Sequence, residues 1–352
     1  MTRLDATVEN TEENSLWGVL NKRNINWVTL GNYKFSTWYG NAAYFNTLDV
    51  NHDYLGYEFS NKLSQLPKSS KKHPQKHLLL HHTANTSSPR ANDDFWLDCL
   101  HVCQYCFKYT ASKTELVNHT ANCVHNTAKP TIGKLVYYDE DKFIIRQVRG
   151  FQSQLFCQNL ALFGKLFLDD KSVYYDIDHF DFYIVYSIDE KNGPNFKPMG
   201  FFSKEILSWD NNNNLACICI FPPFQRRHLG WLLIEFLYAL AKRTPLQMKS
   251  GPEFPLSPYG KICYFKFWSI KLAYTISHTL KNGYGFTLND LSDITGFRKE
   301  DILLTLEYMK LIVKDNEEEY SLRLGNLDKF CETKNINKND PRVVLNEDFV
   351  LI

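Results

Sequence analysis

The chain has 352 residues, which is enough for one large domain or for two to three smaller ones. Hydrophobic residues make up 44% and the net charge is +1, which excludes a wholly disordered chain and a strongly basic nucleic-acid footprint. We expect a soluble, intracellular protein, because no apolar run is long enough for a membrane helix and the N-terminus lacks a signal-peptide core. The nine cysteines, an odd count, favour metal ligands and free thiols over a disulfide framework.

The N-terminal third combines aromatic, strand-like segments with polar ones. Residues 1–15 are polar and are predicted to form a disordered tail. Residues 16–60 and 95–150 are predicted to form a β-rich lobe. Residues 61–94, between these two parts, are polar and low in complexity, which indicates an insertion or a linker.

The spacing of cysteine and histidine predicts a zinc site within residues 95–150. A CxxC turn presents two thiolates, and a helix with His and Cys four positions apart presents two more ligands on one face. The four candidate ligands are Cys103, Cys106, His119 and Cys123. Four protein ligands make a structural site; the alternative is a set of unliganded side chains. Cys99, His101 and His125 have less suitable spacing, and the helix offers few side chains that could read DNA bases.

Residues 151–270 have the pattern of a mixed α/β core. A helix is predicted ahead of strands at 182–188, 199–207 and 215–221, and another helix spans 230–243. The first helix is expected to bury one face, formed by Leu155, Leu160, Phe163, Leu166 and Phe167.

The segment after the strand at 215–221 is typical of a phosphate-binding loop. Residues 225–230 precede a helix, whose first N–H groups and dipole attract anions. Arg226 and Arg227 add positive charge, and Gly230 allows close approach of the backbone. An ordinary strand–loop–helix connection with exposed arginines explains the pattern equally well.

A single carboxylate lies in the proline-rich loop 250–257. Aromatic and proline surface beside Glu253 would disfavour the charged form and raise its pKa. Such a group suits a general base that deprotonates an amine. A solvated acid on a surface loop is the alternative.

Residues 271–352 are predicted to form a helix-turn-helix-like lobe. Two helical segments lie within 287–313, and Gly296 is expected to end the first. Their predicted core positions are Leu291, Ile294, Phe297, Ile302, Leu303, Leu306 and Met309. Acidic residues dominate both helices, which favours packing or partner docking over DNA reading.

Taken together, these segments resemble the MYST family of histone acetyltransferases, over roughly residues 31–45 and 95–315. Within the family, the short chain is most similar to the fungal "something about silencing" branch. The matching runs are GNYKFSTWY (31–39), the Cys-Cys-His-Cys knuckle, CQNLALFGKLFLDDKSVYYDIDHFDFY (157–183), GFFSKE (200–205), LACICIFPPFQRRHLG (215–230), LLIEFLYAL (232–240) and PEFPLSPYGKICYFKFW (252–268).

The resemblance implies a mixed α/β (α+β) fold. An acetyl-CoA-binding catalytic core at 151–270 would follow an N-terminal zinc-knuckle lobe and precede a C-terminal, winged-helix-like lobe at 271–352. The implied activity is transfer of acetyl from acetyl-CoA to a lysine of a histone tail, with core histone four expected as the substrate. It also implies a nuclear protein that acts in chromatin silencing or boundary control, with nucleosomes and companion subunits as partners. We expect neither membrane association nor sequence-specific DNA binding.

Residue roles follow from the resemblance position by position. Glu253 falls on the family's general base, Lys165 on its autoacetylated lysine, and Cys217 on a cysteine proposed as acetyl acceptor. A thiol without a nearby base is a poor nucleophile, which favours direct attack in a ternary complex over a covalent intermediate at Cys217. A backbone N–H near Cys217 and Ile218 is expected to bind the oxyanion. The expected acetyl-CoA groove comprises Ile218, Ile220, Gln225, Arg226, Arg227, His228, Leu229, Gly230, Trp231 and Ser257.

Several departures from the family pattern stand out. His228 replaces the first glycine of the family's QxxGxG loop, so a positive φ there would strain the backbone and weaken cofactor binding. The family's GSPE reads SGPE at 250–253, after a slightly longer segment. A second interpretation is therefore a non-catalytic or partner-dependent chromatin scaffold that retains the fold. A zinc-finger DNA-binding protein is a third, which the near-neutral charge disfavours.

Overall fold

The computed structural model describes most of the chain: residues 19–20, 23–44, 97–140, 142–168, 176–189, 195–206, 213–243, 249–281, 285–314 and 320–351. The predicted tail at 1–15 and the predicted insertion at 61–94 lie outside these residues. Among the helices of the described part, none combines the length and the apolar character needed to cross a bilayer.

The chain divides into two compact units. Unit 1 comprises residues 1–135, 140–199 and 221–223, and unit 2 comprises residues 136–139, 200–220 and 224–352. The division falls inside the segment assigned to the catalytic core from sequence. The predicted domain bounds therefore stay a prediction, and each unit is described by itself.

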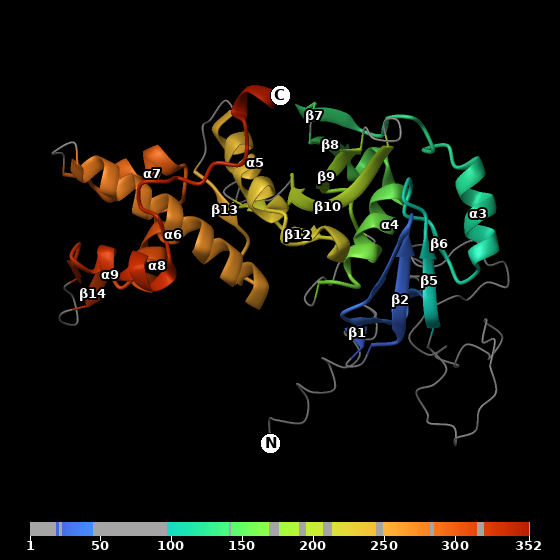
Figure 1. Ribbon diagram of the computed structural model, residues 1–352, viewed down its shortest axis with the longest axis horizontal. Helices are drawn as coiled ribbons and strands as arrows, with labels where there is room; N and C mark the ends of the chain where they lie inside the picture. Colours follow the sequence, from blue (N-terminus) through green and yellow to red (C-terminus); the bar gives the residue numbers. More distant parts are fainter. Residues whose placement is uncertain are drawn as a thin grey trace, which may run out of the picture. The chain divides into compact units, whose positions relative to one another are not determined.

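The elements form the mixed α/β architecture that the sequence predicts (Figure 1). The largest sheet has five strands in the order β12-β10-β9-β8-β7. Strands β8 and β9 pair antiparallel, from Phe143 opposite Ser187 to Arg149 opposite Asp181. The strands of this sheet are β7 (Lys134–Asp139), β8 (Phe143–Arg149), β9 (Phe180–Asp189), β10 (Asn195–Glu205) and β12 (Cys217–Ile220).

Unit 1 also contains a four-stranded sheet in the order β3-β2-β5-β6. In this sheet β2 pairs antiparallel with β3 and parallel with β5, although β2 and β5 lie far apart in sequence. The elements of this part are β1 (Val19–Leu20), β2 (Ile25–Leu30), β3 (Tyr33–Ser36), β4 (Gly40–Asn41), η1 (Ala42–Tyr44), β5 (Leu97–Val102), β6 (Tyr109–Thr110) and α3 (Lys113–Asn122).

The first predicted core helix is α4 (Gln154–Gly164), which follows η3 (Gly150–Gln152). The predicted apolar positions from 160 to 167 are buried. The prediction for Leu155 was wrong, because this side chain is 69% exposed. Leu155 precedes Leu160 by five residues, which places it about 140° away around a helix of 3.6 residues per turn.

In unit 2, the strand predicted at 215–221 proves to be two shorter strands. β11 (Asn213–Leu215) pairs in parallel with β13 (Gly251–Pro252), whereas β12 pairs antiparallel with β10. Ala216 lies between them outside both strands. The strand predicted at 215–221 is therefore divided, because the chain changes its partner strand at Ala216.

Helices form most of the rest of unit 2. Gly296 ends α7 with a φ of 77°, as predicted for a helix C-terminus. A two-stranded β14–β15 hairpin follows α8, in the position of a wing. The elements after β12 are η4 (Pro222–Phe224), α5 (Leu229–Arg243), α6 (Pro258–Lys281), α7 (Leu288–Thr295), α8 (Lys299–Tyr308), β14 (Ile312–Lys314), β15 (Tyr320–Leu322), α9 (Asn326–Lys334) and η5 (Glu347–Phe349).

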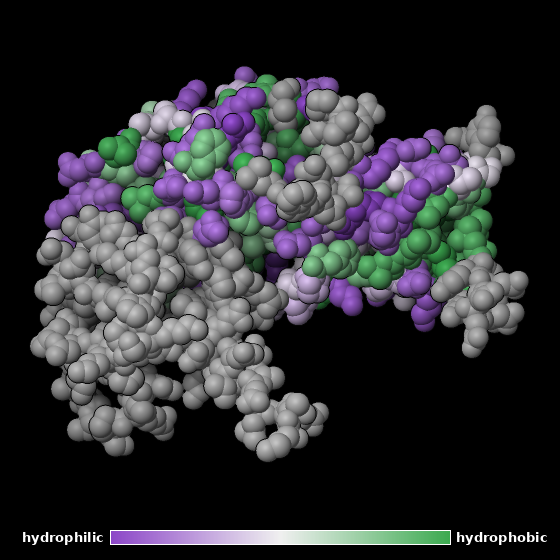
Figure 2. Space-filling view, turned by 180° about the vertical axis from the view of Figure 1, so that it is seen from behind, coloured by the Kyte–Doolittle hydropathy of each residue, from purple (hydrophilic) through white to green (hydrophobic). Residues whose placement is uncertain are grey.

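Two predicted core residues of these helices are on the surface. Ile294 is 53% and Leu303 is 42% exposed, whereas the other five predicted positions are buried. Both belong to short helices, in which one apolar position per turn suffices to cover the core. Figure 2 shows hydrophobic residues gathered over the C-terminal helices on the face drawn there.

Candidate functional site

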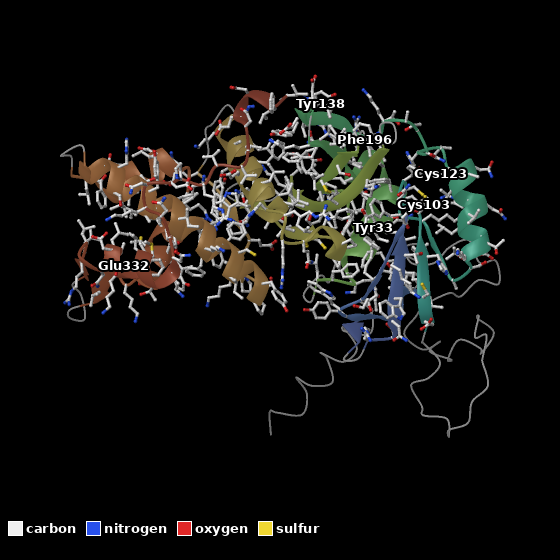
Figure 3. The ribbon with its side chains drawn as sticks, in the orientation of Figure 1. Tyr33, Cys103, Cys123, Tyr138, Phe196 and Glu332 are labelled. Atoms are coloured by element: carbon white, nitrogen blue, oxygen red, sulfur yellow. The ribbon has the colours of Figure 1, made fainter. Side chains whose placement is uncertain are left out.

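The four predicted metal ligands meet in unit 1. Cys103 follows β5, Cys106 lies in the turn after it, and His119 and Cys123 come from α3 and its C-terminus. Their ligand atoms lie within 4.8 Å of one another, and Figure 3 labels Cys103 and Cys123 in this cluster. The predicted grouping is thus confirmed, and the group contains none of the three residues with less suitable spacing.

The chemistry of the cluster fits a zinc ion. The Cys106 Sγ lies 3.1 Å from the His119 Nε2, near the ~3.5 Å expected between sulfur and nitrogen ligands of one tetrahedral zinc. A hydrogen bond from the Cys106 thiol lowers the pKa of Cys103 to about 5, so one thiolate is already favoured. With four protein ligands and no open position, the centre is suited to structure and not to catalysis.

The knuckle is anchored to the core of unit 1 by one aromatic side chain. Phe107, directly after the second cysteine, has a φ of 60° and is buried. Its ring centroid lies 5.7 Å from those of Phe156 and Phe163 and 6.0 Å from that of Phe221. A metal ion held by the four ligands would fix the turn that places this ring in the core.

The predicted cofactor loop lies in unit 2 between β12 and α5. Gln225 Nε2 donates to the carbonyl of Ile220 at 2.9 Å, which ties the loop back to the strand. Arg226 and Arg227 are exposed, and the Arg227 guanidinium lies 5.6 Å from the Phe224 ring. The loop thus presents two cations at the start of a helix, as predicted.

His228 has a positive φ. This conformation was considered from the sequence because His228 stands where the family's loop has a glycine. Its φ is 62°, and that of Arg226 is also 62°, in a region that side chains with a Cβ seldom occupy. Gly230 differs, because a Cβ added there would meet only Ile220 Cγ1 at 3.9 Å. The protein itself therefore does not require glycine at position 230; only an approaching ligand would.

Arg342, which the sequence analysis missed, lies against this loop. Its Nη2 donates to His228 Nδ1 at 3.0 Å, which requires the tautomer with the proton on Nε2. Its guanidinium lies 5.1 Å from the Trp231 ring, whose Nε1 donates to the Arg342 carbonyl at 2.9 Å. Arg342 is 114 residues from His228, so no local sequence pattern indicates this contact.

Buried Glu235 on α5 holds the same C-terminal segment. Its Oε2 accepts from the N–H groups of Val344 and Leu345, each at 2.8 Å. Its Oε1 pairs with Lys271 Nζ at 2.7 Å. The C-terminal segment is thereby bound along the helix that follows the loop.

The strand β12 offers donors on its open side. Phe221 N–H bonds the Met199 carbonyl, and Cys217 is opposite Ser203 in the same register. The alternation of an antiparallel ladder then turns the N–H groups of Ile218 and Ile220 away from β10. β12 ends the sheet order, so within the described sheet these N–H groups face its edge.

Glu253 follows β13 and is held by its own backbone. Its N–H donates to the Leu215 carbonyl at 2.9 Å, two residues before Cys217. Glu253 is exposed as a residue, but partial burial of its carboxyl group raises its pKa, and the Glu205 carboxylate adds to the rise. The predicted direction of the shift is confirmed, and the carboxyl group is suited to accept a proton.

Two other predicted residues have identifiable structural contacts. Ser257 Oγ accepts the N–H of Gly260 at 3.2 Å, and its carbonyl accepts that of Lys261 at 2.8 Å, so Ser257 caps α6. Lys165 lies at the C-terminus of α4 in unit 1 and is 3% exposed. The roles assigned to both in cofactor binding and modification stay predictions.

Comparison with known proteins gives consistent matches. The sequence model of the MOZ/SAS family matches residues 130–349. Histone acetyltransferase SAS2 of Saccharomyces cerevisiae is 43% identical over 314 residues, 89% of this chain and 82% of that protein. The Tip60 homolog of Caenorhabditis elegans and MOF of Drosophila melanogaster, both named histone acetyltransferases, are each 38% identical over 61% and 60% of this chain. The chain spans only 45% and 24% of these two longer relatives.

Proposed function

Because the chain belongs to the MOZ/SAS family, we propose that it is a histone lysine acetyltransferase whose reaction is carried out by residues of unit 2. Acetyl-CoA is the cosubstrate. The observation that carries the proposal is Glu253, a carboxyl group with a raised pKa whose backbone is fixed two residues from the start of β12. Its position supports a general base close to the strand on which acetyl transfer would occur.

Residues at the start of α5 would bind the cosubstrate. The first N–H groups of a helix lack helical partners and attract phosphate oxygens, and Arg226 and Arg227 add charge beside them. The two outward N–H groups of Ile218 and Ile220 would bind the rest of the cosubstrate along the strand edge. Ser257 would lie along the same groove.

In the proposed reaction Glu253 takes a proton from the substrate ammonium, whose ordinary pKa near 10.4 keeps it charged at neutral pH. The freed amine attacks the thioester carbonyl carbon, so a C–N bond forms while the carbonyl oxygen becomes an oxyanion. The Ile218 N–H would donate to that oxygen. When the C–S bond breaks, CoA leaves as a thiolate, which takes up the second proton that the newly acylated nitrogen loses. Cys217 lines the site and forms no bond.

Glu253→Gln tests this reaction. Purified protein with its companions is given labelled acetyl-CoA and histones, and kcat/KM is measured for the wild type, Glu253→Gln and Cys217→Ala. Loss of a general base is expected to lower the rate about 100- to 10,000-fold, whereas Cys217→Ala is expected to cost less than about tenfold. Full activity of Glu253→Gln would refute the base, and an inactive Cys217→Ala with an active Glu253→Gln would favour a covalent intermediate.

The finer assignments rest on the resemblance and on surface features. The proposed substrate is a lysine of core histone four in nucleosomes, and the proposed location is the nucleus, with a role in chromatin silencing or boundary control. Exposed apolar residues on the C-terminal helices, including Ile294 and Leu303, support docking of a companion subunit. Lys165 is the proposed site of autoacetylation, which mass spectrometry of protein incubated with acetyl-CoA would detect.

The left-handed backbone at His228 supports a second candidate, a scaffold that keeps the fold without turnover. Residues 226 and 228 have backbone conformations that a glycine would adopt without strain. Calorimetric titration with acetyl-CoA separates the two candidates. No heat of binding for the wild type, together with binding and activity in His228→Gly, would favour the scaffold.

A further inference from the structure

One arginine contacts the chain on both sides of Glu253. Arg298 precedes α8, and its Nη2 donates to the Pro252 carbonyl at 2.7 Å. Its guanidinium carbon lies 5.6 Å from the centroid of the Phe254 ring. Pro252 and Phe254 are the immediate neighbours of the proposed base, so a single side chain contacts the residue before it and the residue after it.

The guanidinium itself is held in a fixed position. Arg298 Nε and Nη2 bond the two oxygens of Asp301 at 2.9 and 3.1 Å, and Nη1 bonds Asn213 Oδ1 at 2.9 Å. The Asp301 side chain is fully buried and that of Arg298 is 13% exposed. A planar guanidinium can serve several partners at once, which an ammonium cannot do. The contacts thus connect α8, β11 and β13.

The backbone on this side leaves no room for a side chain at Gly251. A Cβ added to Gly251 would lie 2.1 Å from Asp301 Oδ2 and 2.6 Å from Arg298 Nε. Further contacts hold the same stretch, since Ser250 N–H donates to the Gly296 carbonyl at 3.2 Å and Ser250 Oγ accepts from Asn214 Nδ2 at 2.9 Å. The loop is fixed up to Pro252, and the arginine is the side chain that carries this constraint past Glu253.

We propose that Arg298 is a positioning residue for acetyl transfer, which sets the placement of the Glu253 carboxyl group by binding the Pro252 carbonyl and the Phe254 ring. This rests on the proposed function of Glu253. Arg298 is 45 residues from Glu253 and acts only through its neighbours, so it need not touch either substrate. The proposed cosubstrate-binding residues at 225–230 are not among its contacts, which separates positioning from cosubstrate affinity.

Arg298→Met, Arg298→Lys and Gly251→Ala test the proposal in the full chain with its companions. For Arg298→Met, kcat is expected to fall about 10- to 100-fold, because small misplacements of reacting groups cost that much, while the acetyl-CoA KM stays within about threefold. Arg298→Lys is expected to recover part of kcat, and Gly251→Ala to reproduce the loss with Arg298 still present. Adding Arg298→Met to Gly251→Ala should lower kcat little further, because both act on one contact.

Arg243→Met is the matched control, since Arg243, like Arg298, donates to main-chain carbonyls of unit 2, in its case those of Glu347 and Val350. Its kcat is expected to equal that of the wild type. A merely structural role of Arg298 would lower the unfolding midpoint and leave kcat per folded molecule unchanged, which would overturn the proposal. The proposal would also be overturned if Arg298→Met raised the acetyl-CoA KM and lowered kcat/KM by the same factor, because kcat would then be unchanged.

Hydrogen exchange tests the positioning role of Arg298 without depending on catalytic activity. The amides of Ser250, Gly251, Glu253 and Phe254, the residues of 250–255 that carry an N–H, are expected to exchange at least about tenfold faster in Arg298→Met than in the wild type, with segments around Arg243 unchanged. Unchanged exchange at 250–255 would overturn the positioning role even if the wild type is active. An inactive wild type with faster exchange in the variant would contradict the acetyltransferase function and leave the contact established.

Discussion

Glu253 has a proton affinity that its surroundings increase. Burial raises its pKa most, and the like charge of Glu205 raises it further. A base works only when deprotonated, so a raised pKa makes kcat/KM fall on the acid side at a higher pH than an ordinary glutamate would. The acid limb of the pH profile is therefore expected to report this residue.

Glu205→Gln should move that limb to lower pH. Removing the neighbouring carboxylate lowers the pKa of Glu253, although only in part, because burial remains. The measurement is kcat/KM for a lysine peptide against pH at saturating acetyl-CoA, with exposed Glu307→Gln as the control. A limb that stays in place or moves upward would show that another group limits the rate.

His228 allows the cost of a left-handed residue to be measured directly. His228→Ala and His228→Gly both lose the bond from Arg342, and only Ala keeps a Cβ on backbone with a φ of 62°. His228→Gly is expected to be the more stable of the two by about 1 kcal/mol. The stabilities of the two variants are compared by urea unfolding. Equal midpoints would mean that the loop accommodates a Cβ at position 228 without losing stability.

Single residues were predictable from sequence when their chemistry is local. The zinc ligands lie within 21 residues, so spacing alone grouped them, and position 228 was marked by its place in a glycine loop. Arg298 and Arg342 could not be found in this way, because their partners lie 46 and 114 residues away in sequence. Surface arginines are common, and nothing in their immediate neighbours distinguishes these two.

Among the elements, α5 contacts the C-terminal segment through Trp231, Arg243 and the buried carboxylate of Glu235. Glu235→Gln would remove the negative charge that pairs with Lys271 and weaken the bonds to two backbone N–H groups. We expect a loss of about 2 kcal/mol in the free energy of unfolding, measured with urea. Exposed Glu307→Gln should change it by less than about 0.5 kcal/mol. A similar small change in Glu235→Gln would mean that this segment contributes little to stability.

Helices with a long apolar repeat were predicted well, whereas the pairing of strands was not. Helices α4 and α5 follow from hydrophobic spacing, and Gly296 marked the end of α7. The division at Ala216 was missed, because alternation along one segment carries no information on which strand pairs with it. The error at Leu155 has a different cause, because its position about 140° around the helix from Leu160 already places it off the buried face.

At the scale of the whole molecule, the metal centre and the proposed reaction site belong to different units. Cys106→Ser is expected to abolish zinc binding at this group, measured by atomic emission, and to lower the Tm through loss of the Phe107 turn. Cys99→Ser, outside the ligand group, should retain one zinc per chain. A full zinc content in Cys106→Ser would refute the ligand assignment.

The fold class was predictable because it depends on the order of helices and strands, which periodicity and a family resemblance both indicate. The pairing of β2 with β5 was not, since 66 residues separate the end of the first strand from the start of the second. Contacts between segments so far apart in sequence are decided by how whole faces pack. The structure is therefore most informative where residues close in space are distant in sequence.

The single residue between β11 and β12, Ala216, has a consequence for how such an enzyme could change its substrate specificity. The proposed base is attached to residue 215, and the proposed acetyl-transfer strand begins at residue 217. The spacing between the two is thus set by two peptide units of main chain, whose length no side-chain substitution alters. Surface residues could therefore diverge and select a different lysine without changing this main-chain spacing, whereas the placement of the Glu253 side chain would still depend on Arg298.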